Sequence, residues 1–492
     1  MLFENTFQSL TIEIYLIISI SILLLYGVIN STSLITNRFV MIRNISILSI
    51  YMLLISILLI YNNPFINIIT FNNTFIVDNF INIIKIIVLL GTLASILISL
   101  DYVKYKKINN FEYIILIIFS TIAMLLMTSS YNLISLYLSI ELQSLSFYVL
   151  ASMKRNSEYS TEASFKYFIV GVFASGFLLL GFSILYGITG ITNIEQFYKL
   201  FVDNFNIIEY FGIYISILLI LIAFLFKIGA VPFHMWLPDV YEGAPLSITA
   251  FFAITPKIVL LSLLLRLFIY TFYDVIFYLN NLFIISSILS MILASIAALY
   301  QTKIIRLLAY SAIGHIGYIL IGIVTSSVES IQASLLYLII YMIMTINIYS
   351  CVISLRSKKN NIEVKYIYEF INMSKNNPIL AITIAFILFS MAGIPPLAGF
   401  FSKLYIFSSA INSSMYLLTF IGIFTSVIAA VYYIYIIRIM YFDKSSIWIY
   451  LKPINVELSY LIAITFFFIL FFFIFASPIL VYTHQLALFL SI

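Results

Sequence analysis

The feature that most constrains this sequence is a series of long, almost uninterrupted apolar runs. Hydrophobic residues make up 63% of the 492 residues and charged residues only 9%, whereas about a quarter of the residues of a soluble domain are charged. A helix needs about 20 apolar residues to cross the hydrocarbon core of a bilayer, and about fourteen runs approach that length. The sequence therefore predicts an all-α polytopic membrane protein.

Two of these runs contain helix-breaking residues. Gly229 and Pro232 interrupt the seventh run, and Pro395 and Pro396 interrupt the twelfth, so we expect two broken helices. The runs lie near residues 10–28, 41–60, 79–100, 113–128, 132–153, 164–188, 208–231, 246–269, 276–300, 304–325, 330–354, 378–410, 415–440 and 458–482.

Basic residues follow the odd-numbered runs and are scarce after the even-numbered ones. Examples after the first, third, fifth, ninth and eleventh runs are Arg43, Lys104, Arg155, Arg306 and Arg356. By the positive-inside rule these connections face the matrix or cytoplasm, and both termini then lie on the opposite side. The net charge of +5 is small and its residues are dispersed between runs, which gives no support for a nucleic-acid partner.

A short motif occurs twice. Residues 162–167 and 332–337 match at Ala, Ser and Tyr, and Tyr148 and Tyr318 are related by the same offset of 170 positions. Five predicted spans separate the copies, so the second copy is inverted, as in many transporters. We divide the chain into N-terminal helices (1–110), a first five-helix repeat (111–272), a second, inverted repeat (273–442) and a last helix (443–492).

Several classes of site lack support in the sequence. The single cysteine, Cys351, excludes disulfides within the chain and iron–sulfur or Cys-rich zinc sites carried by this chain alone. Glycine-rich nucleotide loops and metal-ligand spacings are absent, so nicotinamide, flavin, nucleotide and metal sites have no support. We expect no cofactor on this chain. The bias towards Ile, Asn, Phe and Tyr is typical of an AT-rich genome and favours an organelle gene.

Three ionisable residues of the first repeat lie in or next to apolar runs. Glu141 is near the middle of the fifth run, where a charge costs about 2.5–3.5 kcal/mol and usually marks an ion path. Lys227 ends the seventh run beside its break, and Lys257 follows Pro256 deep in the eighth run. A structural ion pair at Glu141 and a lysine reaching the interface at Lys227 are the alternatives.

The second repeat offers Lys403 and His315. Lys403 follows the second break and stands 176 positions after Lys227, so we interpret it as the counterpart of that lysine. His315 is in the middle of the tenth run and His234 is just beyond the first break. Water-filled membrane paths use histidine as a relay, although a hydrogen-bonded structural histidine is the alternative for both.

The remaining charged residues have weaker claims. Lys166 and Lys85 lie near the ends of runs, where a lysine can extend to the interface, and Lys166 is kept as a secondary candidate together with His234. Asp239 and Glu242 precede Pro245, and we expect them in a solvated turn or helix cap without chemistry.

Three segments carry a family resemblance: IELQSLSFYVLASMKRNSEYSTEASFKYFIVGVFASGFLLLG, FKIGAVPFHMWLPDVYEGAPLSITAFFAITPK and MAGIPPLAGFFSKLYIF. They closely resemble the antiporter-like membrane subunits of respiratory NADH:quinone oxidoreductases (complex I), in particular the subunit 2 family with its bacterial counterpart, subunit N. The resemblance covers roughly residues 110–440. The family's proton path corresponds here to Glu141, Lys227, Lys257 and Lys403, and a lysine at the last position favours subunit 2 over subunit 4.

The resemblance implies a proton-translocating, non-redox subunit of an NADH:ubiquinone reductase, a translocase. Its place would be the mitochondrial inner membrane, with both termini on the intermembrane-space side, or alternatively a bacterial plasma membrane. NADH, FMN, iron–sulfur clusters and ubiquinone would belong to partner subunits. Expected partners are other membrane-arm subunits of complex I, especially subunit 4 and the small membrane subunits, and lipids such as cardiolipin.

The implied mechanism depends on a movable ion pair. Burial lowers the proton affinity of an amine and a nearby carboxylate raises it, so the separation of Glu141 from Lys227 would tune proton binding. We expect a proton to pass from Lys227 to Lys257 and His315 and then to Lys403. A subunit of a cation/proton antiporter, a structural spacer of the membrane arm and, less well supported, a free-standing permease are the alternatives.

Overall fold

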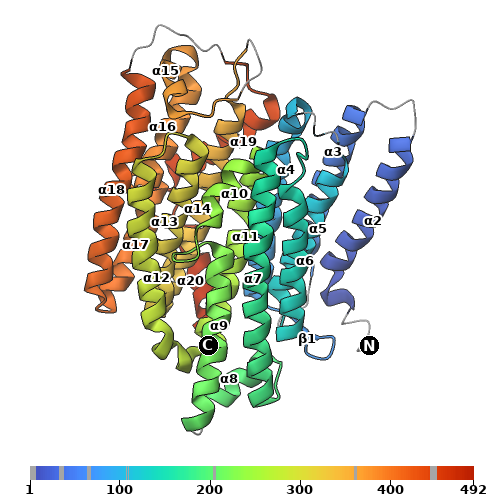
Figure 1. The fold of residues 1–492 in the computed structure, drawn as a ribbon, viewed down its shortest axis with the longest axis vertical. Helices are drawn as coiled ribbons and strands as arrows, with labels where there is room; N and C mark the ends of the chain where they lie inside the picture. Colours follow the sequence, from blue (N-terminus) through green and yellow to red (C-terminus); the bar gives the residue numbers. More distant parts are fainter. Residues whose placement is uncertain are drawn as a thin grey trace. The chain divides into compact units, whose positions relative to one another are not determined.

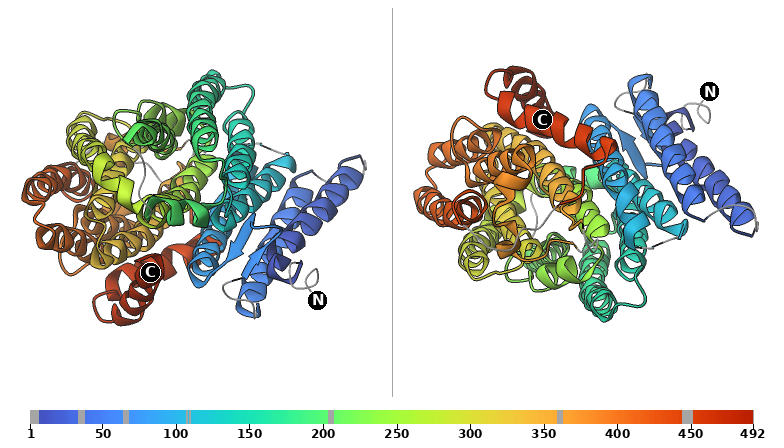
Figure 2. Two further views of the ribbon diagram at one scale, coloured as in Figure 1. Left: turned by 90° about the horizontal axis from the view of Figure 1, so that it is seen from below. Right: turned by 90° about the horizontal axis from the view of Figure 1, so that it is seen from above.

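A computed structural model describes residues 7–32, 38–63, 68–106, 108, 110–202, 207–358, 363–443 and 451–491. The chain forms two compact units. The first comprises residues 1–228 and 243–278, and the second comprises residues 229–242 and 279–492. Within each unit, long helices lie alongside one another, seen along their length in Figure 1 and closer to end-on in Figure 2.

In the first unit the helix α11 lies at the centre. All of its residues are buried, and it packs against α4, α5 and α9. A short antiparallel hairpin, β1 with β2, pairs Ile69 with Ile76. The elements of this unit are α2 Thr11–Thr32, α3 Arg38–Tyr61, β1 Ile68–Thr70, β2 Phe75–Val77, α4 Asn79–Lys106, α5 Glu112–Ser129, α6 Leu133–Ala151, α7 Glu158–Thr189, α8 Ile194–Val202, α9 Ile207–Ile228, α11 Leu246–Leu265 and the π-helix η1 Arg266–Thr271.

In the second unit α14 has the central place. It packs against α13, α16, α17, α19 and α20, while α16 also packs against α18 (Figure 1). Two of the helices listed next extend into the first unit. Gly243, the last residue of α10, and Tyr273–Tyr278, at the start of α12, belong to the first unit. The elements are α10 Trp236–Gly243, α12 Tyr273–Leu299, α13 Ile304–Thr325, α14 Val328–Ser354, η2 Ile367–Phe370, α15 Met373–Asn376, α16 Pro378–Ala392, α17 Ala398–Asn412, α18 Tyr416–Tyr441, α19 Val456–Phe471 and α20 Ser477–Ser491.

The predicted fold class, an all-α polytopic membrane protein, is confirmed. Within the described residues, 12 helices are long and apolar enough to cross a membrane. The other two predicted spans are each divided, into α16 and α17 and into α19 and α20. The division between α19 and α20 was not predicted. Its signal is Pro478, at the second residue of α20, because the first turn of a helix is the position that suits proline best.

The two predicted helix breaks are present. α9 ends at Ile228 and α16 at Ala392, and the next residues, Gly229 and Gly393, have φ angles of +82° and +89°. Such left-handed backbone suits glycine and ends a helix while leaving its last carbonyl groups available to other donors. Lys227 lies in the last turn before the first of these ends.

The internal repeat extends over several helices. The helices α7 and α14 begin 170 positions apart, at Glu158 and Val328, and α11 and α18 begin 170 apart, at Leu246 and Tyr416. The predicted equivalence of Lys227 and Lys403 is wrong. Lys227 lies in the last turn of α9, before its break, whereas Lys403 lies in α17, after the other break.

Candidate functional site

Glu141 is held in the middle of α6, a helix that begins where the side chain of Asn132 caps it by accepting a hydrogen bond from the Ile134 N–H at 3.1 Å. The Ser144 hydroxyl donates to Oε2 of Glu141 at 3.2 Å. The other carboxylate oxygen, Oε1, is buried and has no hydrogen-bond partner among the described residues. A buried acceptor without a donor is energetically costly, so this oxygen has an unused capacity to accept a hydrogen bond.

Lys227 is half-buried near the end of α9 and experiences the attraction of the Glu141 charge. Within the described part of the chain, however, these two residues form no ion pair at 4.0 Å or closer. The carboxylate and the ammonium are therefore near enough to interact electrostatically but are separated. Movement of either side chain changes this separation and with it how strongly Lys227 holds its proton.

Lys257 is the more enclosed of the two family lysines in the first unit. It follows Pro256 within α11 and is 3% exposed. Its surroundings are the fully buried residues of α11 and the helices packed on them. An ammonium group at such a position is costly to bury unless the groups around it pair with it or accept its hydrogen bonds.

In the second unit, Lys403 is held by the end of the helix that precedes it. Its Nζ donates to the backbone carbonyls of Met391 at 3.0 Å and Ala392 at 2.8 Å, the last two residues of α16. These carbonyls are available because the helix ends there, and they lie at the negative end of its dipole. Nζ also lies 5.3 Å from the centre of the Tyr318 ring, a cation–π distance.

His315 and Lys403 line the same small cavity of the second unit. The free volume of the cavity, about 10 Å³, is at the lower limit for one water molecule. Nδ1 of His315 is hydrogen-bonded to the Tyr337 hydroxyl at 2.6 Å, and Nε2 lies 3.5 Å from the Tyr433 hydroxyl. The imidazole of His315, the amine of Lys403 and the phenols of Tyr318, Tyr432 and Tyr433 thus line one space.

The two secondary candidates have different surroundings. Lys166 is 44% exposed and forms an ion pair with Glu162 one turn away, at 2.8 Å. His234, between α9 and α10, is 5% exposed, and its Nδ1 is buried without a hydrogen-bond partner among the residues described. His234 therefore resembles a relay candidate more closely than Lys166 does.

The structure corrects two predictions about charged residues. Lys85 is fully buried and forms an ion pair with Glu13, itself 2% exposed, so it does not extend to an interface. Asp239 and Glu242 lie on the short helix α10 rather than in a solvated turn. Their partners are Arg306, at 3.4 Å and 3.1 Å respectively, and Lys303, which pairs with Glu242.

Sequence reasoning missed the tyrosines of the site, although the repeat contained a signal. In the first unit the rings of Tyr148 and Tyr167 are 5.2 Å apart, and in the second unit the rings of Tyr318 and Tyr337, each 170 positions later, are 6.4 Å apart. At the same offset the position of Glu141 is occupied by Ser311. The two copies therefore share the pair of tyrosines, but only the first copy has a carboxylate at the position of Glu141.

The described residues contain no cluster of three His, Cys, Asp or Glu side chains that could hold a metal ion.

With this geometry, comparison with known proteins identifies the family. A model of the NADH:quinone oxidoreductase/Mrp antiporter transmembrane family matches residues 130–429. The matched segment holds all five primary candidates, which are Glu141, Lys227, Lys257, His315 and Lys403. The chain belongs to this family.

Similarity to individual proteins extends beyond that segment. The chain is 49% identical to NADH-ubiquinone oxidoreductase chain 2 of Marchantia polymorpha, with 99% of both chains covered. It is 45% identical to the protein of that name from Arabidopsis thaliana, covering 98% of this chain and 97% of the other. NADH-quinone oxidoreductase subunit N of Pelagibacter ubique is 44% identical over 88% of this chain and 89% of its own length.

Solved structures share the fold. A chain of respiratory complex I from Thermus thermophilus is similar with a TM-score of 0.77 and 23% identity, covering 95% of this chain and 98% of that one. A chain of the Mrp complex from Dietzia has a TM-score of 0.81 and 17% identity, with 99% and 98% covered. At these identities the likeness shows the fold alone.

Proposed function

We propose that this chain is the proton-translocating subunit 2 of an NADH:ubiquinone oxidoreductase in the mitochondrial inner membrane. The observation that carries the proposal is the separated pair of Glu141 and Lys227, placed in the family segment beside a broken helix. The near full-length similarity to chain 2 proteins supports the choice of subunit. NADH, flavin, iron–sulfur clusters and quinone then belong to partner subunits.

Each unit contributes its own set of proton-binding groups. In the first, approach of Glu141 to Lys227 stabilises the ammonium, and withdrawal of the carboxylate lowers its proton affinity. The proton then passes to Lys257, which has no room for bulk water around it. In the second set, His315 exchanges protons through its hydrogen-bonded tyrosines and Lys403 completes the path. These groups titrate together, so no single group sets the proton affinity of the set.

The driving energy comes from quinone reduction in partner subunits. Moving one charge against 100 mV costs about 2.3 kcal/mol, and this chain has no redox centre of its own in the proposal. Its part in the reaction is therefore to couple a conformational change to proton transfer. The neighbouring antiporter-like subunit 4 and the small membrane subunits are the proposed sources of that change.

The test is NADH-driven proton pumping in membranes whose assembled complex carries Lys257→Ala. The proposal expects normal assembly with a collapse of pumping and of coupled electron transfer. The matched control is Lys199→Ala, because the Lys199 side chain is 69% exposed and pairs with Glu195 on the short helix α8.

Two results would count against the proposal. If assembly and pumping both persist in Lys257→Ala, the buried lysines are structural and the chain is a spacer. If transport in liposomes, followed by swelling, requires Na⁺ or K⁺ in exchange for protons, the chain is a cation/proton antiporter subunit instead.

A further inference from the structure

Arg266 is a buried charged residue that the proposed proton path does not use. It lies at the end of the eighth apolar run, whereas the basic residues of this chain concentrate after the odd-numbered runs. In the structure it is the first residue of η1, which continues α11, and it is 6% exposed. Its guanidinium keeps its proton at physiological pH, so it is a permanent positive charge inside the first unit.

The guanidinium is held by groups from two other helix ends. Nη2 donates to Oδ2 of Asp78, just before α4, at 3.2 Å, and Nη1 donates to the carbonyl of Thr128, near the end of α5, at 3.3 Å. The guanidinium carbon lies 5.9 Å from the centre of the Tyr131 ring. The positive charge is therefore fixed where the start of α4 and the ends of α5 and α11 come together.

Other polar groups surround this point. The Tyr131 hydroxyl donates to Oε2 of Glu195, in the first turn of α8, at 3.0 Å. Tyr270 in η1 is near enough to interact electrostatically with the guanidinium. Carboxylates are among the groups that relay protons in membrane proteins, and a tyrosine hydroxyl both donates and accepts hydrogen bonds. This end of the first unit therefore has groups along which a proton can move.

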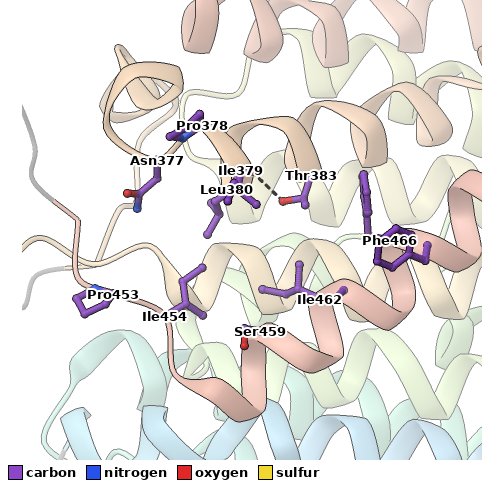
Figure 3. Close-up of a pocket in the computed structure, with 12 residues that line it drawn as sticks. Asn377, Pro378, Ile379, Leu380, Thr383, Pro453, Ile454, Ser459, Ile462 and Phe466 are labelled. Carbon is purple, nitrogen blue, oxygen red and sulfur yellow. Dashed lines mark hydrogen bonds between the residues drawn. The ribbon is translucent and has the colours of Figure 1, made fainter.

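A membrane protein can stop protons either with hydrocarbon or with a fixed positive charge. The groove between α16 and α19 in the second unit is an example of the first kind, because none of its lining residues is ionisable (Figure 3). The polar end around Arg266 differs from that groove, so hydrocarbon alone does not close it. A fixed arginine is the second kind of barrier, since its charge repels protons and other cations in a pore.

The position of Arg266 relative to Lys257 suits a barrier. Both residues lie on the helical segment made by α11 and η1. Nine positions separate them, which corresponds to about 13 Å at 1.5 Å per residue. The Arg266 side chain is 7% exposed and its partner Asp78 is 24% exposed, so the positive group is the more deeply buried of the pair. A proton that leaves Lys257 in this direction meets the guanidinium before the carboxylate.

We propose that Arg266 is the barrier residue of the first unit, whose fixed charge prevents protons at Lys257 from exchanging with the solvent at this end. Asp78 and the Thr128 carbonyl position the charge. The alternation of basic residues predicts that this end faces the intermembrane space, the side to which protons would be pumped. Without the barrier, pumped protons would return through Lys257. This inference rests on the proposed proton path, in which Lys257 passes its proton on towards the second set.

The experiment measures passive proton flux through the intact complex in liposomes, without NADH and with a membrane potential imposed by K⁺ and valinomycin. Arg266→Gln/Asp78→Asn removes both charges and keeps hydrogen-bonding groups, so no buried charge is left without its partner and the complex should assemble. The flux should rise about tenfold over wild type, equivalent to about 1.4 kcal/mol in the barrier. Arg438→Gln/Asp443→Asn is the matched control, because this arginine–aspartate pair of the second unit is 68% and 40% exposed. Its flux should equal that of wild type.

Two further variants separate a barrier from a structural contact between helix ends. Adding Lys257→Ala to Arg266→Gln/Asp78→Asn should return the flux to the wild-type value, because the leak passes through Lys257. Asp78→Asn alone weakens the contact but keeps the guanidinium, so its flux should stay at the wild-type value. Asp78→Asn also tests the proposal if the variant with both substitutions does not assemble.

Three results would overturn the barrier. They are a wild-type flux in assembled Arg266→Gln/Asp78→Asn, a leak that persists after Lys257→Ala is added, and a raised flux in Asp78→Asn alone. The proposed proton path is tested separately by NADH-driven pumping in Lys257→Ala. Persistent pumping there would reject the path itself, whereas these three results reject the barrier even when pumping depends on Lys257.

Discussion

Two of the Glu–Lys sets in the first unit are made of the same residue types but are in different states. Glu13 on α2 and Lys85 on α4 form a closed ion pair that is 2% and 0% exposed. Glu141 on α6 and Lys227 on α9 interact electrostatically without an ion pair among the described contacts. The closed set lies before the family segment of residues 130–429, and the open set lies inside it.

This difference separates a structural role from a functional one. A closed, buried pair has no solvent to exchange protons with, and separating it costs several kcal/mol. Each set has one buried carboxylate oxygen without a donor among the described residues, but in the open set the distance between the charges can change at lower cost, because no ion pair has to be broken among the described contacts. The comparison predicts that damage to the closed set lowers stability and that damage to the open set lowers pumping.

The largest effect should follow from Lys85→Met. The substitution leaves the Glu13 carboxylate buried without its partner, which destabilises the protein by about 3–5 kcal/mol. We expect less assembled complex on native gels and a lower melting temperature. Proton pumping per assembled complex should be unchanged, because the pair lies outside the proposed path.

The matched variant for this prediction is Glu13→Leu/Lys85→Met, which replaces both charges by apolar side chains. Removing a whole buried pair is often neutral or stabilising, so assembly should return. A loss of pumping per complex in either variant would place Glu13 and Lys85 in the proton path and remove the contrast with Glu141 and Lys227.

The next effect is expected at Lys403, whose ammonium is held by neutral carbonyls rather than by a carboxylate. Lys403→Met removes two charge-assisted hydrogen bonds and leaves the acceptors of Met391 and Ala392 unpaired, a loss of about 1.5–3 kcal/mol. Lys403→Arg keeps the charge and the donors but does not release a proton at physiological pH. Arginine should therefore restore assembly, measured on native gels, but not pumping. Recovery of pumping with arginine would show that only the charge is needed.

Glu141→Gln tests the open set directly. Glutamine preserves the shape and the hydrogen bond from Ser144, so assembly should be close to wild type. Pumping should fall about tenfold, equivalent to about 1.4 kcal/mol in the barrier, because a neutral amide cannot stabilise the Lys227 ammonium. The measurement is protons translocated per NADH oxidised. Normal pumping in this variant would show that Lys227 titrates without a carboxylate partner.

The fold could be predicted from the sequence because its strongest local signals, the long apolar runs and the helix-breaking residues, also limit the structures that the backbone can form. In a bilayer an apolar run of membrane length must form its backbone hydrogen bonds internally, and a helix does so. Gly229 with Pro232 breaks such a helix. The break before Pro478 was missed because the run appeared to continue through it. Hydropathy measured over a window averages out a single proline, and a single proline is an ambiguous signal, because Pro256 lies within the continuous helix α11.

The candidate site could be predicted in part. Glu141, Lys257 and His315 were found because charged or polar side chains within apolar runs are costly. Lys85 was misinterpreted because its distance from the end of a run says nothing about the partner that faces it. The pairing of Lys227 with Lys403 failed for a related reason: similar surroundings in sequence did not place both lysines on the same side of their helix breaks.

A smaller effect is expected from Tyr337→Phe in the second unit. It removes the hydroxyl that is hydrogen-bonded to Nδ1 of His315 and costs about 0.5–1.5 kcal/mol. The rate of pumping should fall severalfold with normal assembly, because His315 loses the group that fixes its tautomer. Tyr300→Phe is the control, since Tyr300 is 81% exposed. An unchanged rate in Tyr337→Phe would reduce His315 to a structural histidine.

The smallest effect is expected from Lys166→Ala. Its ion pair with Glu162 is exposed on α7, and pairs of this kind contribute about 0–1 kcal/mol. Melting temperature and protons pumped per NADH should both stay at wild-type values, as they should in the control Lys199→Ala. A pumping defect confined to Lys166→Ala would extend the functional set of the first unit from α6 and α9 to the surface of α7. An exposed lysine would then exchange protons with the buried ones, and exposure alone would no longer distinguish the structural charges from the mobile ones.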